Sequence, residues 1–403
     1  MLKVLKFGGT SVGTLERIQN VANIIKKIRD EGHDVIAVVS AMSGETNKLL
    51  EYAEYYSNDP KSEEMDVLLS SGERVTSALL SIALTQMGYK AMSMSGRQAG
   101  IVTDNSHTKA RIESIDTKEM KSAISSGNII VVAGFQGVAH GSNRVSTLGR
   151  GGSDLTAVAI AGAIEADICE IYTDVDGIYT TDPRIEPKAK KLEKISYDEM
   201  LELASLGAKV LQNRSVEMAK KLNVNLVSRS SFTPEVEGTL ITKEENIMEE
   251  PIVSGIALDR NQIRVGMYGV TDKPGIAALI FSSLANADIN VDMIVQTRGL
   301  DGTTDLDFTI PTTDFVECQK VMGKFKEQTK NIDYNENICK VSIVGVGMKS
   351  NTGVASKAFT ALANENINIR IISTSEIKVS MIVEEKYAEL AVRSLHEAYN
   401  LDK

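Results

Sequence analysis

The sequence predicts an α/β protein: a mostly parallel sheet covered by helices on both faces, followed by two copies of a small α+β domain. Two observations lead to this prediction. Over residues 1–245, continuous apolar runs alternate with segments whose apolar residues recur at helical spacing, which is typical of a parallel sheet buried on both sides. Beyond residue 263 the chain repeats itself.

Apolar runs predict the strands of the first part, and helical periodicity predicts its helices. The strands are expected at residues 2–7, 34–40, 128–133 and 167–173, and the helices at 15–30, 155–165 and 197–209. A charged stretch at 244–251 ends in Pro251 and indicates a domain boundary. We therefore assign 1–245 to a first domain, and 246–263 to a linker with a strand that can join the last domain.

The end of the chain contains an internal repeat. Residues 269–294 align with residues 347–372 at an offset of 78, and ten of these 26 positions are identical. Each copy reads as a strand, a glycine turn, a helix and a strand that begins Ile-Asn. The period is too long for a solenoid, so we expect two small α+β domains, at 264–336 and 337–403.

Length and charge limit the class of protein. With 403 residues the chain exceeds what one hydrophobic core usually supports, so two or three domains are expected. The formal net charge of −10 disfavours nucleic acid and anionic membranes as partners. No apolar run reaches the ~18 residues of a membrane span, and the N-terminus, interrupted by Lys3 and Lys6, does not resemble a signal peptide.

Cysteine and histidine form no metal-ligand or disulfide pattern. Cys169, Cys318 and Cys339 lie far apart, and the four histidines are scattered. This spacing predicts a reducing, cytoplasmic environment and no metal site built from the protein's own side chains.

An unusual run, Lys6-Phe7-Gly8-Gly9-Thr10-Ser11-Val12, lies between the first predicted strand and the first predicted helix. Glycines at such a place let backbone N–H groups approach a ligand, and a helix start favours an anion. Lys6 adds a positive charge. The spacing is neither a Walker sequence nor a dinucleotide-binding motif, so the residues alone predict an anion site, with a packing turn as the alternative.

Five further polar runs follow in order along the chain: residues 39–47, 69–74, 147–154, 172–184 and 207–211. Each one alone can be explained as a surface loop, a solvated helix face or a turn capped by aspartate. Together with the N-terminal run they resemble the aspartate kinases of the amino-acid kinase family. The C-terminal repeat resembles the tandem ACT domains of the same proteins, and no dehydrogenase domain follows, as in their monofunctional form.

The resemblance implies a phosphoryl transfer from ATP to the β-carboxylate of L-aspartate, with Mg²⁺ accompanying ATP. It assigns catalysis to Lys6, Gly8, Gly9, Asp154 and Lys209, aspartate binding to Ser40, Thr46, Glu73, Arg150 and Ser153, and ATP binding to Lys6, Gly8, Gly9, Thr173, Asp174, Tyr179, Arg184, Lys209 and Val210. Because a carboxylate is already ionised at neutral pH, no general base is expected.

The resemblance also implies feedback regulation by lysine, threonine or both through the first repeat. The effector residues would be Asp272, Ile276, Ala277, Asn290, Asp292 and Gln296, whose alternative role is in turns and caps. A homodimer or tetramer is expected, and an internal start at Met248 could yield a separate regulatory subunit and an α2β2 assembly.

Two other interpretations of the sequence stay open at this point. Glutamate 5-kinase, acetylglutamate kinase and uridylate kinase share the fold and differ in substrate. A non-catalytic amino-acid sensor would keep the repeats beside an inactive kinase fold. The presence of Lys6, Glu73, Arg150 and Lys209 disfavours the sensor, because an inactive site usually loses such residues.

Overall fold

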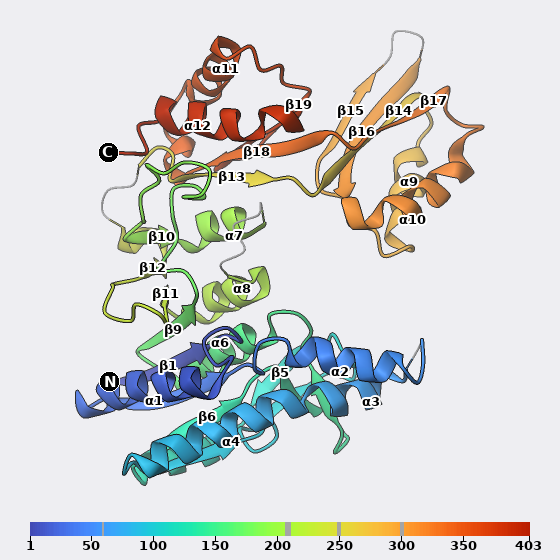
Figure 1. Ribbon diagram of the computed structural model, residues 1–403. Helices are drawn as coiled ribbons and strands as arrows, with labels where there is room; N and C mark the ends of the chain where they lie inside the picture. Colours follow the sequence, from blue (N-terminus) through green and yellow to red (C-terminus); the bar gives the residue numbers. More distant parts are fainter. Residues whose placement is uncertain (59, 206–210, 248–250, 299–301) are drawn as a thin grey trace. The chain divides into compact units, whose positions relative to one another are not determined.

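The computed structural model describes residues 1–403 except 59, 206–210, 248–250 and 299–301 (Figure 1). The described residues divide into two compact units, each with its own sheets and hydrophobic core. The first unit contains the described residues of Met1–Ile178, Lys191–Ala204 and Lys209–Met248, and the second contains those of Tyr179–Lys190, Ser205–Ala208 and Glu249–Lys403.

The first unit is built on an eight-stranded sheet in the order β10-β12-β11-β9-β1-β2-β6-β3. Neighbouring strands are parallel except for β11 and β12, so the predicted mostly parallel sheet is confirmed. The strands are β1 (Leu2–Phe7), β2 (Asp34–Val39), β3 (Ala91–Met94), β6 (Ile129–Ala133), β9 (Ile168–Thr173), β10 (Lys194–Ser196), β11 (Leu226–Ser230) and β12 (Thr239–Thr242).

Helices cover both faces of this sheet. Leu5 and Phe7 of β1 share one hydrophobic cluster with α1 and α4, whereas Lys6, on the opposite face of the same strand, pairs with Asp154 of α6. The helices are α1 (Leu15–Asp30), α2 (Glu45–Glu54), α3 (Ser62–Leu69), α4 (Ser71–Gln86), α5 (Lys118–Ser125), α6 (Gly152–Ile164), α7 (Tyr197–Ser205) and α8 (Asn213–Leu222).

The stretch Ser62–Gln86, which comprises α3 and α4, has the length and apolar composition of a membrane span, and half of its most apolar 18-residue window is buried inside the protein. Two of its carboxylates, Asp66 and Glu73, are buried in the unit. Buried carboxylates with polar partners are features of a core helix, because lipid would leave them unsatisfied.

A second, smaller sheet of the first unit has the order β5-β4-β7-β8. Its strands are β4 (Ile101–Thr103), β5 (Ile112–Ile115), β7 (Gln136–Ala139) and β8 (Val145–Thr147). Hydrophobic periodicity does not predict these strands, because segments of three or four residues are too short to show a period. The sheet matters for the site, since the glycine-rich turn predicted to bind substrate directly follows β8.

The second unit contains two four-stranded sheets, ordered β15-β16-β14-β17 and β13-β18-β20-β19. The first comprises β14 (Gln262–Thr271), β15 (Ile294–Arg298), β16 (Thr303–Pro311) and β17 (Asn331–Asn335), with α9 (Ile276–Ala285) and α10 (Phe315–Met322). The second comprises β13 (Gly255–Asp259), β18 (Ile338–Val344), β19 (Ile371–Thr374) and β20 (Lys378–Glu384), with α11 (Val354–Asn364) and α12 (Ala388–Ala398).

These two sheets correspond to the two copies of the repeat, and α9 and α11 occupy matching positions at the offset of 78. β13 precedes both copies in sequence, yet it pairs antiparallel with β18 of the second copy. Short 3₁₀ helices complete the described elements: η1 (Glu244–Asn246), η2 (Thr312–Asp314), η3 (Gly323–Phe325), η4 (Val346–Lys349) and η5 (Glu385–Tyr387).

One short segment of the predicted first domain packs in the second unit. Residues 179–190 lie inside the range 1–245, yet they group with the second unit. The Thr180 carbonyl accepts the N–H of Ile256 at 2.7 Å, and the Thr180 hydroxyl lies 3.0 Å from Nε2 of the buried His396. Ile185 packs against the core around α12. The first compact unit is therefore not one continuous stretch of sequence.

We expect Gly134→Ala to destabilise the first unit, because Gly134 lies where β6 and α6 approach closely. A Cβ added there would stand 2.9 Å from Ser153 Cβ and Oγ and 3.0 Å from the Val39 carbonyl oxygen. Overpacking of this kind costs about 1–3 kcal/mol, which calorimetry would record as a lower Tm. Gly323→Ala, at a position with open space around it, is the control and should leave Tm unchanged or slightly higher.

Candidate active site

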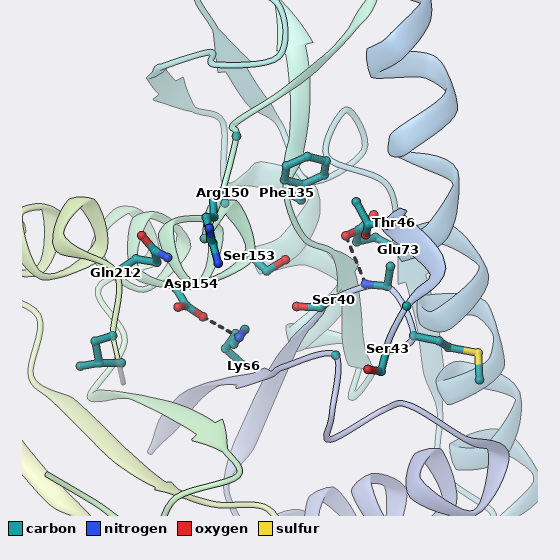
Figure 2. Close-up of a pocket in the computed structure, with 18 residues that line it drawn as sticks. Lys6, Ser40, Ser43, Thr46, Glu73, Phe135, Arg150, Ser153, Asp154 and Gln212 are labelled. Atoms are coloured by element: carbon teal, nitrogen blue, oxygen red, sulfur yellow. Dashed lines mark hydrogen bonds and ion pairs between the residues drawn. The ribbon is translucent and has the colours of Figure 1, made fainter. Parts of the chain in front are cut away.

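A pocket of about 340 Å³ opens at the carboxyl edge of the large sheet (Figure 2). Phe7 of β1, Val39 of β2 and Ala133 of β6 are in register at this edge, and loops at the carboxyl ends of parallel strands commonly form binding sites. The lining residues that the sequence predicted are Lys6, Gly9, Ser40, Thr46, Glu73, Arg150, Ser153 and Asp154. The structure thus brings together residues from four distant runs of sequence.

Lys6 and Asp154 form an ion pair within the pocket. Lys6 Nζ lies 2.6 Å from Asp154 Oδ1, and both side chains are about nine-tenths buried. Asp154 stands in the first turn of α6, so the pair ties the end of β1 to the start of this helix. The N-terminus of a helix carries a partial positive charge, which adds to the charge of Lys6 on this side of the pocket.

The two glycines after β1 contribute differently. A Cβ added at Gly8 would lie 3.2 Å from Lys6 Nζ, the end of a flexible side chain, and one added at Gly9 would lie 3.2 Å from the Ala41 carbonyl oxygen, which is backbone. A side chain at either position would therefore crowd its neighbour, more severely at Gly9. The N–H of Gly8 donates to the Tyr172 carbonyl at 3.3 Å. Gly8 therefore contributes space, and its N–H is already used within the sheet.

Glu73 lies at the opposite side of the pocket from Arg150 (Figure 2). Only 4% of the residue is exposed. Oε1 accepts the Ala41 N–H at 3.1 Å, and the buried Oε2 has no hydrogen-bond partner among the described residues. Burial raises the pKa of this carboxyl to about 7, against a smaller opposing effect of the Ala41 hydrogen bond. An ammonium group placed at Oε2 would supply the missing donor.

The substrate loop, which we define as residues 148–153, runs from β8 into α6. α6 begins at Gly152, three residues earlier than predicted, because Gly151 adopts a left-handed conformation (φ +73°) as its N-cap. Ser153 therefore lies in the first helical turn. Arg150 is exposed and lines the pocket, and no described residue forms a hydrogen bond or ion pair with it.

Sequence reasoning missed two lining residues, Phe135 and Gln212. Phe135 has φ +70°, which is unusual for a bulky side chain, and its N–H donates to the Thr156 hydroxyl at 3.1 Å. Gln212 packs against Gly151, where an added Cβ would stand 2.0 Å from Gln212 Cγ. Neither residue belongs to a pattern of charge or glycine that could have indicated it.

The residues predicted to bind the nucleotide through the loop after β9 are not among those lining this pocket. Thr173 ends β9 in the first unit and Asp174 follows it, whereas Tyr179 and Arg184 belong to the second unit. The exposed guanidinium of Arg184 holds Asp182 with hydrogen bonds of 2.7–3.2 Å. Three further residues, Lys209, Val210 and Met248, lie outside the described residues, so the predictions for them stay untested.

The residues predicted to bind an effector surround the start of α9 and the strand β15. Asp272 follows β14, Ile276 and Ala277 begin α9, Asn290 and Asp292 lie between α9 and β15, and Gln296 is in the edge strand β15. The structure adds one residue that the sequence did not predict. Lys340 of β18, with a side chain only 3% exposed, pairs with Asp292 and so links the two copies of the repeat.

No group of three or more His, Cys, Asp or Glu side chains suited to a metal ion occurs within the described ranges. Asp154 is the pocket carboxylate nearest to the predicted phosphoryl site, and its charge is directed at Lys6. The pocket thus offers mainly cations and hydroxyls to phosphate oxygens. Such a site fits a magnesium ion that arrives bound to ATP, since Mg²⁺ usually keeps phosphate and water ligands.

Comparison with known proteins identifies the family of the chain. The sequence matches the amino acid kinase family over residues 1–227 and the ACT domain over residues 264–322 and 341–399. An aspartokinase from Helicobacter pylori is 60% identical over 407 residues, which cover 100% of both chains. An aspartokinase from Pseudomonas aeruginosa is 54% identical over 408 residues, covering 100% of this chain and 98% of the relative.

Solved structures show the same relationship. The crystal structure of E. coli aspartokinase III in complex with aspartate and ADP (R-state) has a TM-score of 0.82 at 26% identity and covers 99% of each chain. The same enzyme in complex with lysine and aspartate (T-state) has a TM-score of 0.81 at 26% identity, with 100% of both chains covered. The chain therefore belongs to the amino acid kinase family. Its full-length relatives place it among the aspartokinases, which are phosphotransferases.

Proposed function

We propose that this enzyme transfers the γ-phosphoryl group of ATP to the β-carboxylate of L-aspartate, giving 4-phospho-L-aspartate and ADP. The observation that supports it most strongly is the charge pattern of the pocket. Arg150, without a described partner, faces Glu73, which has a free buried oxygen. An amino acid with one carboxylate at Arg150 and its ammonium at Glu73 would satisfy both. E. coli aspartokinase III was crystallised with aspartate and ADP.

In this reaction one anion must approach another. The aspartate carboxylate is ionised at neutral pH, with a reference pKa of ~3.9, so the site needs no base and catalysis depends on positioning and charge neutralisation. Lys6 would neutralise the transferring group, held in place by Asp154 at 2.6 Å. Magnesium bound with ATP would neutralise further phosphate oxygens. Ser40 and Thr46 offer hydroxyls, and Ser153 adds a third from the start of α6.

We assign ATP binding to the loop after β9 and to the segment before α8. Thr173 and Asp174 lie at the same carboxyl edge of the sheet as Lys6, since β9 runs parallel to β1. Tyr179, Arg184, Lys209 and Val210 follow from the resemblance of their runs to aspartate kinases. Arg184 would then exchange its exposed contact with Asp182 for a phosphate group.

We expect Lys6→Ala to lose about 10²–10³ in kcat, because one preorganised donor at a charge-developing centre is worth that much. The variant should still melt cooperatively. Lys3→Ala removes a lysine from the same strand, one that pairs with Glu170 outside the pocket. This control should keep its kcat. Near-normal turnover of the Lys6→Ala enzyme would contradict the role of Lys6.

Glu73 should give aspartate binding a pH dependence. Its pKa is raised to about 7 by burial, so the carboxylate that accepts the ammonium is fully present only above that pH. For a single proton with this pKa, KM for aspartate should rise about tenfold from pH 8 to pH 6. Glu73→Gln, which does not titrate, should have a high KM with a flat pH profile; a tenfold rise in this variant as well would assign the pH dependence to another group.

The product belongs to amino-acid biosynthesis, and we propose that the enzyme catalyses the first step toward lysine, threonine and methionine, through the diaminopimelate route for lysine.

Feedback by lysine, threonine or both would act through the ACT repeats. E. coli aspartokinase III was also crystallised with lysine and aspartate, in a T-state. An effector lowers activity only by binding the less active state more tightly. The Lys340–Asp292 pair joins the predicted effector site to the second repeat.

Assays with lysine and threonine, each alone and both together, should show inhibition. The exposed residues Asn290 and Gln296 lie in the first repeat, and Asn368 is the counterpart of Asn290 in the second. We expect Asn290→Ala or Gln296→Ala to raise the half-inhibitory concentration by about tenfold, the effect of losing hydrogen bonds to a charged ligand, without changing kcat. Asn368→Ala should leave inhibition unchanged; the reverse pattern would move the effector site to the second repeat.

Substrate choice separates this proposal from other members of the family. Mg²⁺-ATP should give ADP release and an acyl phosphate, trapped as a hydroxamate, with aspartate and not with glutamate. A non-catalytic sensor would give neither product.

We place the enzyme in the cytoplasm, where its three buried, unpaired cysteines would stay reduced. We expect a homodimer or tetramer, and use of Met248 as an internal start would give an α2β2 assembly.

A further inference from the structure

Asp66 of α3 is a fully buried carboxylate outside the candidate pocket. Its Oδ1 accepts the Thr147 hydroxyl at 2.5 Å and the Thr108 N–H at 3.0 Å, and its Oδ2 lies 2.5 Å from His107 Nδ1. A carboxylate removed from water is unfavourable unless its oxygens are hydrogen-bonded. These contacts connect Asp66 to three residues that lie far from it in sequence.

The partners of Asp66 surround the start of the substrate loop. Thr147 is the last residue of β8 and precedes Leu148 directly. Gly149 adopts a left-handed conformation (φ +76°), and a Cβ added to it would stand 3.1 Å from the Thr108 carbonyl oxygen. Asp66 thus holds the strand that enters the loop and also the turn against which the loop packs.

Two further contacts fix the backbone between Thr147 and Arg150. Arg214 of α8 donates to the carbonyl oxygens of Leu148 at 2.6 Å and of Ala110 at 3.0 Å. The N–H of Leu148 donates to the Phe135 carbonyl at 2.9 Å. Since Arg150 has no partner of its own among the described residues, the backbone just before it sets the point from which its side chain extends into the pocket.

We propose that Asp66 is a positioning residue for the substrate loop: through Thr147 and Thr108 it fixes the backbone that carries Arg150, and so sets the affinity for the substrate carboxylate. This rests on the proposed binding of aspartate by Arg150. A displacement of about 1 Å at a positioned group can cost on the order of 10² in rate, so a contact outside the pocket is sufficient for such an effect.

Thr147→Val tests the proposal, because it keeps the shape of the side chain and removes the hydroxyl that Asp66 accepts. KM for aspartate should rise about tenfold or more, from the displacement of Arg150, with KM for ATP unchanged. Thr147→Ser restores the hydroxyl and should restore KM. The matched control is Ser146→Ala, which removes the neighbouring buried hydroxyl of the same strand, bonded to Thr103 at 2.6 Å.

A double-mutant cycle separates positioning from general stability. If Thr147 acts through Arg150, then Thr147→Val should raise KM for aspartate much less in an Arg150→Lys background than in the wild type. The proposal is overturned if Thr147→Val leaves KM for aspartate unchanged, if Ser146→Ala raises it equally, or if the effects of Thr147→Val and Arg150→Lys multiply. Wild-type enzyme without aspartate-dependent activity would instead refute the proposed function.

Discussion

The ion pair between Lys6 and Asp154 joins the two chain segments on which the site depends. Lys6 belongs to β1 beside the glycine turn, and Asp154 lies in the first turn of α6 beside the substrate loop. Removing one partner from a buried pair leaves an uncompensated charge, at a cost of about 3–5 kcal/mol. The start of α6 is therefore fixed against the end of β1, and this contact holds the substrate loop at its C-terminal end.

The pocket concentrates positive groups in a chain whose net charge is −10. Lys6, Arg150 and the N-terminus of α6 gather positive charge on one side, while Glu73 stands apart, bonded to the Ala41 N–H. Because Glu73 has no cation among its described contacts, burial dominates its pKa. The pocket therefore keeps its positive groups apart from the buried Oε2 of Glu73, which has no hydrogen-bond partner among the described residues.

The central strands and α1 could be predicted from sequence because their apolar patterns are long and their bounds are marked. β1 and α1 match the expected ranges, and Thr14 caps α1 through the Arg17 N–H. The early start of α6 could not be predicted, since it depends on the conformation of Gly151. Contacts between distant segments could not be predicted from sequence either. The Gly8 N–H donates to the Tyr172 carbonyl, and Lys340 pairs with Asp292.

The range 179–190 interrupts the first compact unit in sequence. At its base, in the first unit, the Ile178 carbonyl accepts the Leu192 N–H at 2.8 Å, and the Ile178 N–H donates to the Thr239 hydroxyl at 2.8 Å. Between Ile178 and Leu192, residues 179–190 pack in the second unit, where Ile185 contacts the core around α12. The loop after β9 is therefore continuous with a segment whose place is set by the ACT repeats.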